Sequence, residues 1–369
     1  MSVKAWLTLS LVPGLGTANL QLLLDQFGSA AGILAARPKE LLSLGPNEKL
    51  CAALANPNPD QRDQLAACEH WLEQPGHHFL HWHDPRWPEL LHATGQAPAG
   101  LFVTGNPDLL SMPQLAIVGS RSATPGGLDI AAQFAAYLAQ AGLTITSGLA
   151  RGIDAAAHRG ALEGGGTTIA VCGTGPDIIY PADNRALAER IAADGALVTE
   201  FPPGTEARRH QFPRRNRLIS GLALGTLVVE AGTRSGSLIT ARYSGEQGRE
   251  IFAIPGSIHS PLSRGCHQLI RQGAKLVETA SDIIDELGAL AGALNPTATG
   301  TNTPERHIDK PDPDYIKLVD SMGFDPVSID QLVERSGLTT EQLSSMLLIL
   351  ELDGRVDSLP GGRFQQRAI

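Results

Sequence analysis

The chain of 369 residues contains little cysteine, and its thiols are not spaced for metal binding or redox chemistry. The four cysteines stand far apart and form no C-x-x-C pair, which excludes the common zinc and redox motifs and predicts reduced thiols. No cysteine or carboxylate cluster at ligand spacing accompanies the four neighbouring histidines, which are His77, His78, His81 and His83. We therefore expect no metal site.

Long apolar runs and an excess of positive charge are also missing. No segment reaches the roughly 18 apolar residues of a membrane helix, and the first residues lack the parts of a signal peptide. This predicts a cytoplasmic protein that does not contact a membrane. The net charge of −9 excludes a surface coated for nucleic acid, so any site for phosphates must be local.

Three motifs of nucleotide-dependent or hydrolytic enzymes are absent as well. The dinucleotide fingerprint G-x-G-x-x-G does not follow the first expected strand, and the P-loop pattern of Gly-Lys before Ser or Thr is missing. No G-x-S-x-G elbow marks a nucleophilic serine. These absences disfavour NAD, ATP hydrolysis and a hydrolase triad, and we expect no cofactor.

What the sequence has in abundance is glycine, at 40 residues, together with short apolar runs. From residue 115 onward, helical patterns separate these runs, which lie at 115–118, 143–146, 168–172, 196–199, 226–229, 250–254 and 275–277. The alternation predicts βαβ units, and hence an α/β core with a Rossmann-like doubly wound parallel sheet. Ligands of such a sheet bind at the carboxyl ends of its strands.

A small helical domain is expected before this core, which we place at residues 76–288. Residues 1–75 carry helical apolar patterns and predict a domain of SAM or helix-hairpin-helix type. Its segment VPGLG, at 12–16, is either a hairpin that offers backbone N–H groups to a phosphate or a tight turn between two packed helices. The lack of Lys and Arg between Lys4 and Arg37 favours the turn.

A linker and a second small domain are expected after the core. Residues 289–313 are rich in Ala, Thr, Asn and Pro without periodicity and predict a flexible linker. Residues 314–369 carry three helical patterns and a β-hairpin, the order of a winged helix, with Ser328 and Thr339 as expected N-caps. Residues 312–369 hold ten acidic and five basic side chains, which disfavours duplex DNA and favours a partner contact or a structural role.

Glycine and polar or basic residues follow the ends of four expected strands. The segments are Gly119-Ser120-Arg121, Ser147 to Asp154, Gly173 to Asp177 and Glu200 to Gly204. Small residues at such ends let backbone amides face an anion, and an arginine adds paired donors to the same oxygen. The four loops predict a phosphate pocket, while any one of them alone also fits an ordinary βα turn.

Residues 208–217 contain five arginines, one histidine and no acid, a local exception in an acidic chain. Phe212 in the middle offers a ring for base stacking while the guanidiniums neutralise the backbone, as in single-strand binding without sequence preference. The alternative is a solvated basic helix start in which Phe212 anchors the core and the arginines pair with carboxylates. Further along, hydroxyls and amides between Glu230 and Thr240 can hold another phosphate at a helix start.

Taken together, these segments resemble the DNA-processing protein A family, also called DprA or Smf. The motifs that carry the resemblance are Ile117–Arg121, Ser147–Asp154, Phe212–Gly221, Glu230–Thr240, Ala253–Ser257, Asp84–Pro88 and Leu101–Asn106. The helical and winged-helix parts occur in the same order in many members, so the resemblance covers nearly the whole chain. Trp87 departs from the pattern, because tyrosine is common there, and this changes packing more than function.

The resemblance implies a single-stranded DNA-binding protein without catalytic activity. Such a protein helps to load the RecA recombinase on single strands in place of single-strand binding protein, and it supports natural transformation. Family members commonly form homodimers through the core. Carried over by motif, the DNA contacts are Arg121, Arg209, Phe212, Asn216 and Arg217, and the residues lining the pocket are Ser120, Gly148, Ser235 and Ser237.

An enzyme akin to the phosphoribohydrolases, which cleave nucleoside monophosphates on a similar sheet, is the alternative. Glu230 would then be its acid/base carboxylate. Against this reading, the P-G-G-x-G-T-x-x-E signature of those enzymes is missing, and Glu230 stands before the glycine-rich turn rather than after it.

Overall fold

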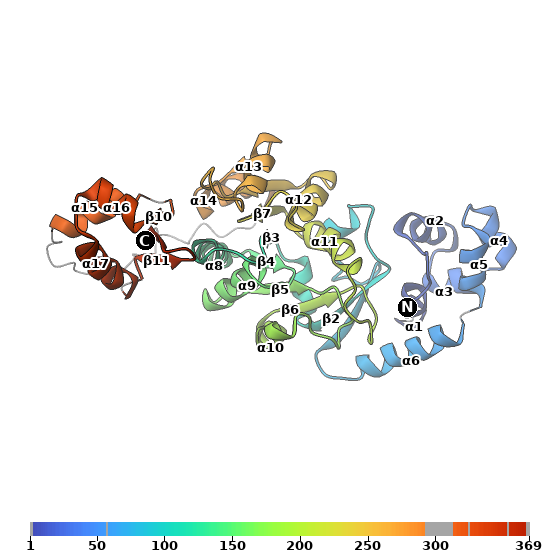
Figure 1. Ribbon diagram of the computed structural model, residues 1–369. Coiled ribbons are helices and arrows are strands. Elements are labelled where there is room, and N and C mark those ends of the chain that lie inside the picture. Colours follow the sequence, from blue (N-terminus) through green and yellow to red (C-terminus); the bar gives the residue numbers. More distant parts are fainter. Residues whose placement is uncertain (1–2, 57, 292–312, 324, 353, 367–369) are drawn as a thin grey trace. The chain divides into compact units, whose positions relative to one another are not determined.

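A computed structural model describes residues 3–56, 58–291, 313–323, 325–352 and 354–366 (Figure 1). The chain divides into two compact units, Met1–Ala298 and Thr299–Ile369. The expected linker lies mostly outside the described residues, and the helix α14 (Ala280–Ala291) extends over its first residues. The finer domain limits at residues 75, 288 and 313 stay predictions. Within the described ranges, no helix has the combined length and apolar character needed to cross a membrane.

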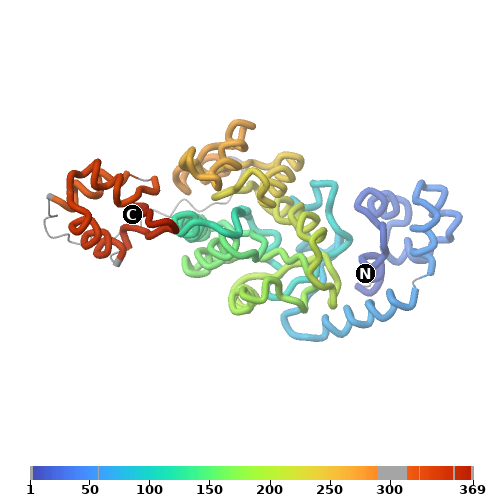
Figure 2. The backbone as a smooth tube through the Cα atoms, viewed as in Figure 1, coloured from blue at the N-terminus to red at the C-terminus, as the bar shows by residue number. Residues whose placement is uncertain are grey.

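The first unit begins with a helical part, drawn in blue in Figures 1 and 2. Side chains of Ser29, Asn47 and Asn58 accept hydrogen bonds from backbone N–H groups three residues later and start three of the helices. The helices are α1 (Val3–Ser10), α2 (Thr17–Phe27), α3 (Ala30–Ala35), α4 (Pro38–Ser43), α5 (Glu48–Ala55) and α6 (Pro59–Leu72). The predicted helices are present, while the likeness to SAM or helix-hairpin-helix modules stays a prediction.

The core of the first unit is a sheet of nine strands in the described residues, in the order β1-β2-β6-β5-β4-β3-β7-β8-β9. Seven of them pair in parallel: β3 (Gln114–Val118), β4 (Thr144–Ser147), β5 (Thr168–Val171), β6 (Ala196–Thr199), β7 (Gly225–Val228), β8 (Glu250–Ala253) and β9 (Lys275–Leu276). Each corresponds to one predicted apolar run. Because the strand order runs outward from β3 in one direction and from β7 in the other, the predicted doubly wound sheet is confirmed.

Helices cover both faces of this sheet, as Figure 1 shows. Leu115 and Ile117 of β3 belong to one hydrophobic cluster with α8 (Pro125–Gln140), α9 (Ile153–Glu163) and α14, while α10 (Arg185–Asp194) packs on β5 and β6. Ala116 and Val118 belong to another cluster, with α11 (Gln211–Leu222), α12 (Ser237–Glu246) and α13 (Arg264–Arg271). The alternation follows from the two-residue period of a strand, and it explains why these runs are apolar throughout.

Two antiparallel strands at the β6 edge were not predicted from the sequence. β2 (Gly100–Gly105) pairs with β6, and β1 (His77–His81) pairs with β2. The histidines of β1 obscure the strand pattern because they pack on aromatic rings rather than on aliphatic side chains. The His77 ring stacks on Trp71 at a centroid distance of 4.0 Å, and the His81 ring stacks on Trp6 at 5.0 Å. Among the described residues, no group of three His, Cys, Asp or Glu side chains is placed to hold a metal ion.

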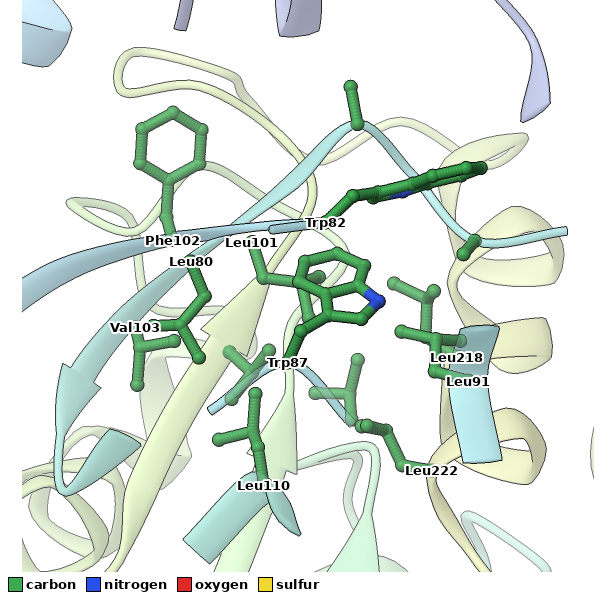
Figure 3. Close-up of a cluster of buried hydrophobic side chains, with 14 of the residues drawn as sticks. Leu80, Trp82, Trp87, Leu91, Leu101, Phe102, Val103, Leu110, Leu218 and Leu222 are labelled. Atoms are coloured by element: carbon green, nitrogen blue, oxygen red, sulfur yellow. The ribbon is translucent and has the colours of Figure 1, made fainter. Parts of the chain in front are cut away.

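A cluster of buried side chains joins this edge to α11 (Figure 3). Trp87 lies at its centre, between Leu101 of β2, Leu91 of the short helix α7 (Glu89–His92), and Leu218 and Leu222 of α11. The cluster holds the inner side of α11 against the sheet, which fixes the direction in which the other side of that helix points.

The second unit has the order of elements of a winged helix. Its elements are α15 (Pro313–Met322), β10 (Val327–Ser328), α16 (Ile329–Ser336), α17 (Thr340–Leu352), β11 (Val356–Leu359) and β12 (Arg363–Gln366), and its strands form a sheet in the order β10-β12-β11. Ser328 and Thr339 accept hydrogen bonds from the backbone N–H groups of Gln331 and Gln342, so both predicted caps are present. β10 was not predicted, because two residues carry no strand pattern.

Candidate functional site

A pocket of about 1000 Å³ lies at the carboxyl ends of β3 and β7. These two strands are neighbours in the sheet but far apart in the chain, since the paired residues Leu115 and Gly225 are 110 residues apart; the strand order reverses between them. Loops after two such strands leave the sheet in opposite directions and open a crevice, which is where α/β sheets bind ligands. The start of α11 and the loop before α13 complete the wall.

The loop after β3 is built from close backbone contacts. A Cβ atom on Gly119 would lie 2.5 Å from Ile153 Cγ1, so only glycine fits. Ser120 Oγ accepts a hydrogen bond from the Ser122 amide at 3.2 Å, and Ser120 O accepts one from the Ile153 amide at 3.1 Å. The loop is therefore fixed, and it presents the exposed side chain of Arg121 to the pocket.

Phe212 lies in the first turn of α11 with its ring against Gly173, where a Cβ atom would be 2.9 Å from the ring. The ring is only partly buried and lines the pocket. Arg121 Cζ lies 5.8 Å from the ring centroid, within cation–π range, and the half-exposed Tyr180 ring lies at a centroid distance of 5.4 Å. Phe212 is therefore neither sealed in the core nor free in solvent. It is held in place and stays partly exposed to the pocket.

The exposed charge of the pocket is positive. Arg121, Arg209, Arg234 and Arg264 are exposed and line it, and the acidic side chain among the lining residues, Asp154, is buried. Four guanidiniums with hydroxyls between them create a local potential that attracts polyanions in a chain that is acidic overall.

A buried pair lies beneath this charged wall. Arg215 donates hydrogen bonds to Gly148 O, at 2.7 Å, and to Val171 O, while Asp154 accepts from the amides of Gly148 and Ala150 at 3.1 and 3.4 Å. Burial lowers the pKa of Arg215 and raises the pKa of Asp154, and the charge of each group opposes the shift of the other. The pair fixes the loop after β4 to the underside of α11.

Hydroxyl and amide groups form the wall after β7. The hydroxyls of Ser235 and Ser237 are 2.7 Å apart, and Asn216 Nδ2 donates to Gly236 O at 3.3 Å. These groups stand at the start of α12, where backbone N–H groups lack partners within the helix and favour an anion.

Comparison with known proteins identifies the family in which these features occur. Residues 78–288 match the family model for DNA recombination-mediator protein A, and residues 302–362 match the DprA winged helix domain. The chain belongs to the DNA recombination-mediator protein A family. This confirms the resemblance found in the sequence, and the winged-helix fold of the second unit with it.

Relatives of the family align over most of the chain. Protein Smf of Escherichia coli is 43% identical over 303 residues, which cover 80% of this chain and 79% of that protein. DNA processing protein DprA of Streptococcus pneumoniae is 47% identical over 203 residues, which cover 55% of this chain and 72% of that protein.

Two solved structures of DNA processing protein A share the fold. The structure from Streptococcus pneumoniae has a TM-score of 0.68 and 37% identity, and it covers 78% of this chain and 99% of that chain. The structure from Helicobacter pylori, solved to describe its single-stranded DNA binding mode, has a TM-score of 0.53 and 27% identity, and it covers 58% of this chain and 96% of that chain.

Most of the residues predicted by family motif lie together. The predicted residues that line the pocket are Ser120, Arg121, Arg209, Phe212, Asn216, Ser235 and Ser237. Gly148 lies beneath the pocket, where its carbonyl oxygen accepts from Arg215 and where a Cβ atom would be 2.6 Å from that guanidinium. Gly148 therefore shapes the pocket from below instead of lining it.

Arg217 lies apart from the pocket. Its Nη2 is 2.6 Å from Glu200 Oε2, its Nη1 donates to Gln96 O, and its side chain is 13% exposed. The basic segment is therefore not one surface, since α11 sends Phe212 and Asn216 to one side and Arg217 to another. A contact of Arg217 with DNA stays a prediction.

Several pocket residues were missed by motif reasoning. They are Asp154, Tyr180, Arg215, Arg234 and Arg264. Arg234 stands inside the predicted Glu230–Thr240 segment and Arg215 inside the basic segment, so both were within reach of the sequence argument. Tyr180 and Arg264 follow β5 and β8 after long loops, and no local pattern marks them.

Glu230, the candidate carboxylate of the alternative hypothesis, is engaged elsewhere. Its two carboxylate oxygens accept hydrogen bonds from the Thr124 amide at 2.9 Å and from the Thr124 hydroxyl at 2.6 Å. It therefore holds the start of α8, and it is not among the residues that line the pocket.

Proposed function

We propose that this protein binds single-stranded DNA in the pocket between β3 and β7. The observation that carries the proposal is a partly exposed aromatic ring, Phe212, among four exposed arginines on a molecule of net charge −9. The single-stranded DNA binding described for the Helicobacter pylori relative supports it.

The chemistry of the pocket suits an unpaired strand. A base that stacks on Phe212 must be free of its partner strand, since the ring is only partly exposed and shares its pocket with Arg121, Arg209 and Arg234. The guanidiniums and the amides at the start of α12 then bind phosphates, which carry no sequence information. We therefore expect binding without sequence preference, with stacking worth roughly 1 to 3 kcal/mol per base.

In the cell, we infer, the bound strand is handed to RecA. The protein would act as a recombination mediator that loads RecA in place of single-strand binding protein, works as a homodimer in the cytoplasm, and supports natural transformation. A dimer places two pockets on one strand and raises the affinity through avidity. The proposal contains no catalytic step, and the engagement of Glu230 with Thr124 supports this.

Binding is tested by fluorescence anisotropy with labelled oligo-dT and with duplex of the same length. We expect oligo-dT to bind more tightly and its affinity to fall steeply between about 50 and 200 mM salt. Phe212→Ala and Arg121→Ala should each weaken binding by about tenfold. Arg190→Ala is the matched control, since it removes an exposed arginine of α10 outside the pocket. Native affinity in both pocket variants, with the fold intact by circular dichroism, would reject the site.

The mediator role needs a separate measurement. RecA filament formation on oligo-dT covered by single-strand binding protein should be faster in the presence of the native protein than with Phe212→Ala. Equal rates with the two proteins would leave single-strand binding standing and remove the loading role.

A further inference from the structure

A second cavity, of about 740 Å³, lies between the hairpin at residues 12–16 and the core. It is lined by the first turn of α2, by residues 95–100, by Glu200 to Pro202, and by Arg214 and Arg217 of α11. The hairpin is the segment for which the sequence left two roles open, and the pocket at Phe212 uses none of these residues.

The start of α2 offers donors to this cavity. Gly16 is the residue before the helix, and no side chain caps the first turn, Thr17 to Asn19, which lines the cavity. Its backbone N–H groups lack partners within the helix and carry the positive end of the helix dipole. Thr17 Oγ1 donates to Ala97 O at 2.7 Å and holds this turn against the core.

Glu200 supplies an independent sign of a missing ligand. It lines the cavity and is 8% exposed. Its Oε2 lies 2.7 Å from Arg214 and 2.6 Å from Arg217, whereas its Oε1 is buried and accepts no hydrogen bond from any residue that the structure describes. A buried carboxylate oxygen without a donor is costly, so a ligand that brings an N–H group would be stabilised there.

The charges in the cavity favour an anion together with that N–H group. Two guanidiniums share one carboxylate, so the cluster is positive, and Arg214 is 59% exposed. A nucleotide combines both requirements, because its phosphate suits the α2 start and Arg214, and each DNA base has an N–H donor on its pairing edge.

We propose that this cavity is a second nucleotide-binding site, occupied by the same strand that stacks on Phe212; this rests on the proposed function. Pro213 lines the first pocket and Arg214 lines the second cavity, and both are exposed, so one step along α11 separates the two sites. The strand crosses the start of α11, and Arg217 and Glu200 form the floor of the second site.

The test uses a substitution that stabilises the helix while repelling a phosphate. Ala18 is exposed at the second position of α2, where an acidic side chain interacts favourably with the helix dipole. Ala18→Glu should bind oligo-dT of about 20 nucleotides roughly fivefold more weakly than the native protein. Ala18→Gln has the shape of the glutamate variant without its charge, and it should weaken binding of this strand less than Ala18→Glu does.

Two further outcomes separate the second site from the Phe212 pocket. Ala18→Glu binding the long strand as tightly as Ala18→Gln, while Phe212→Ala weakens it, overturns the second site and leaves the proposed function standing. A loss in Ala18→Glu on the long strand, with none in Phe212→Ala, supports the second site and rejects the Phe212 pocket.

Discussion

At the scale of single residues, Gly173 sets the position of the Phe212 ring. A methyl group at Gly173 would lie 2.9 Å from the ring, so Gly173→Ala must displace it. We expect binding of oligo-dT to weaken by about threefold to tenfold, with a loss of stability of about 1 kcal/mol. Anisotropy and thermal unfolding measure the two effects. Gly245→Ala is the control, because its new methyl group would meet only Ile251 at 3.5 Å. If Gly173→Ala bound oligo-dT with native affinity, the Phe212 ring in its present position would not contribute to binding.

Buried His158 makes the stability of the core depend on pH. Its Nδ1 donates to Thr168 Oγ1 at 2.7 Å, and burial, aided by the charges of Arg215 and Arg159, lowers its pKa to about 3. In the unfolded chain it titrates near 6.5, so between these values the unfolded state binds the extra proton and stability falls as pH falls.

The contribution of His158 is measured as the free energy of unfolding of the core at pH 7 and pH 5. We expect the native protein to lose about 2 kcal/mol more over this interval than His158→Gln, which has no titrating group. Parallel losses in the two proteins would assign the acid sensitivity to other groups.

At the scale of elements, α16 depends on its first residue. Ser328 and Gln331 form a reciprocal capping box. Ser328→Ala should destabilise the winged helix by about 1 kcal/mol, measured by urea unfolding, whereas Ser321→Ala, which removes a hydroxyl bonded to Lys317 O within α15, should cost less. Equal losses of stability in the two variants would show that the Ser328 cap contributes no more than the Ser321 hydroxyl does.

Elements were easier to predict from the sequence than the directions of side chains. The seven parallel strands were found because both faces are buried, which makes each run apolar throughout. β1 was missed because His77 and His81 pack on Trp71 and Trp6, a contact between residues that a local pattern cannot show. Arg217 was grouped with Phe212 because the segment was taken as one patch. Within a helix the neighbours of Phe212 on one face are three and four residues away, at Arg215 and Asn216.

At the scale of the whole molecule, each compact unit has its own hydrophobic core. Leu318, Leu332 and Leu347 belong to the core of the second unit, and the pocket residues belong to the first. We expect two heat-absorption peaks in calorimetry, with oligo-dT raising the temperature of the larger one only, by mass action. Ser328→Ala should lower the temperature of the smaller peak only. A single peak whose temperature changes both with oligo-dT and with Ser328→Ala would contradict this expectation.

The distance along the chain between the parts of the pocket has a consequence for synthesis. The residues that line the pocket lie between Val118 and Arg264 in the chain. They come together only when β7 pairs with β3. A nascent polypeptide therefore has no finished pocket until Arg264 has left the ribosome exit tunnel, and until then the arginines of the pocket lie dispersed along the chain.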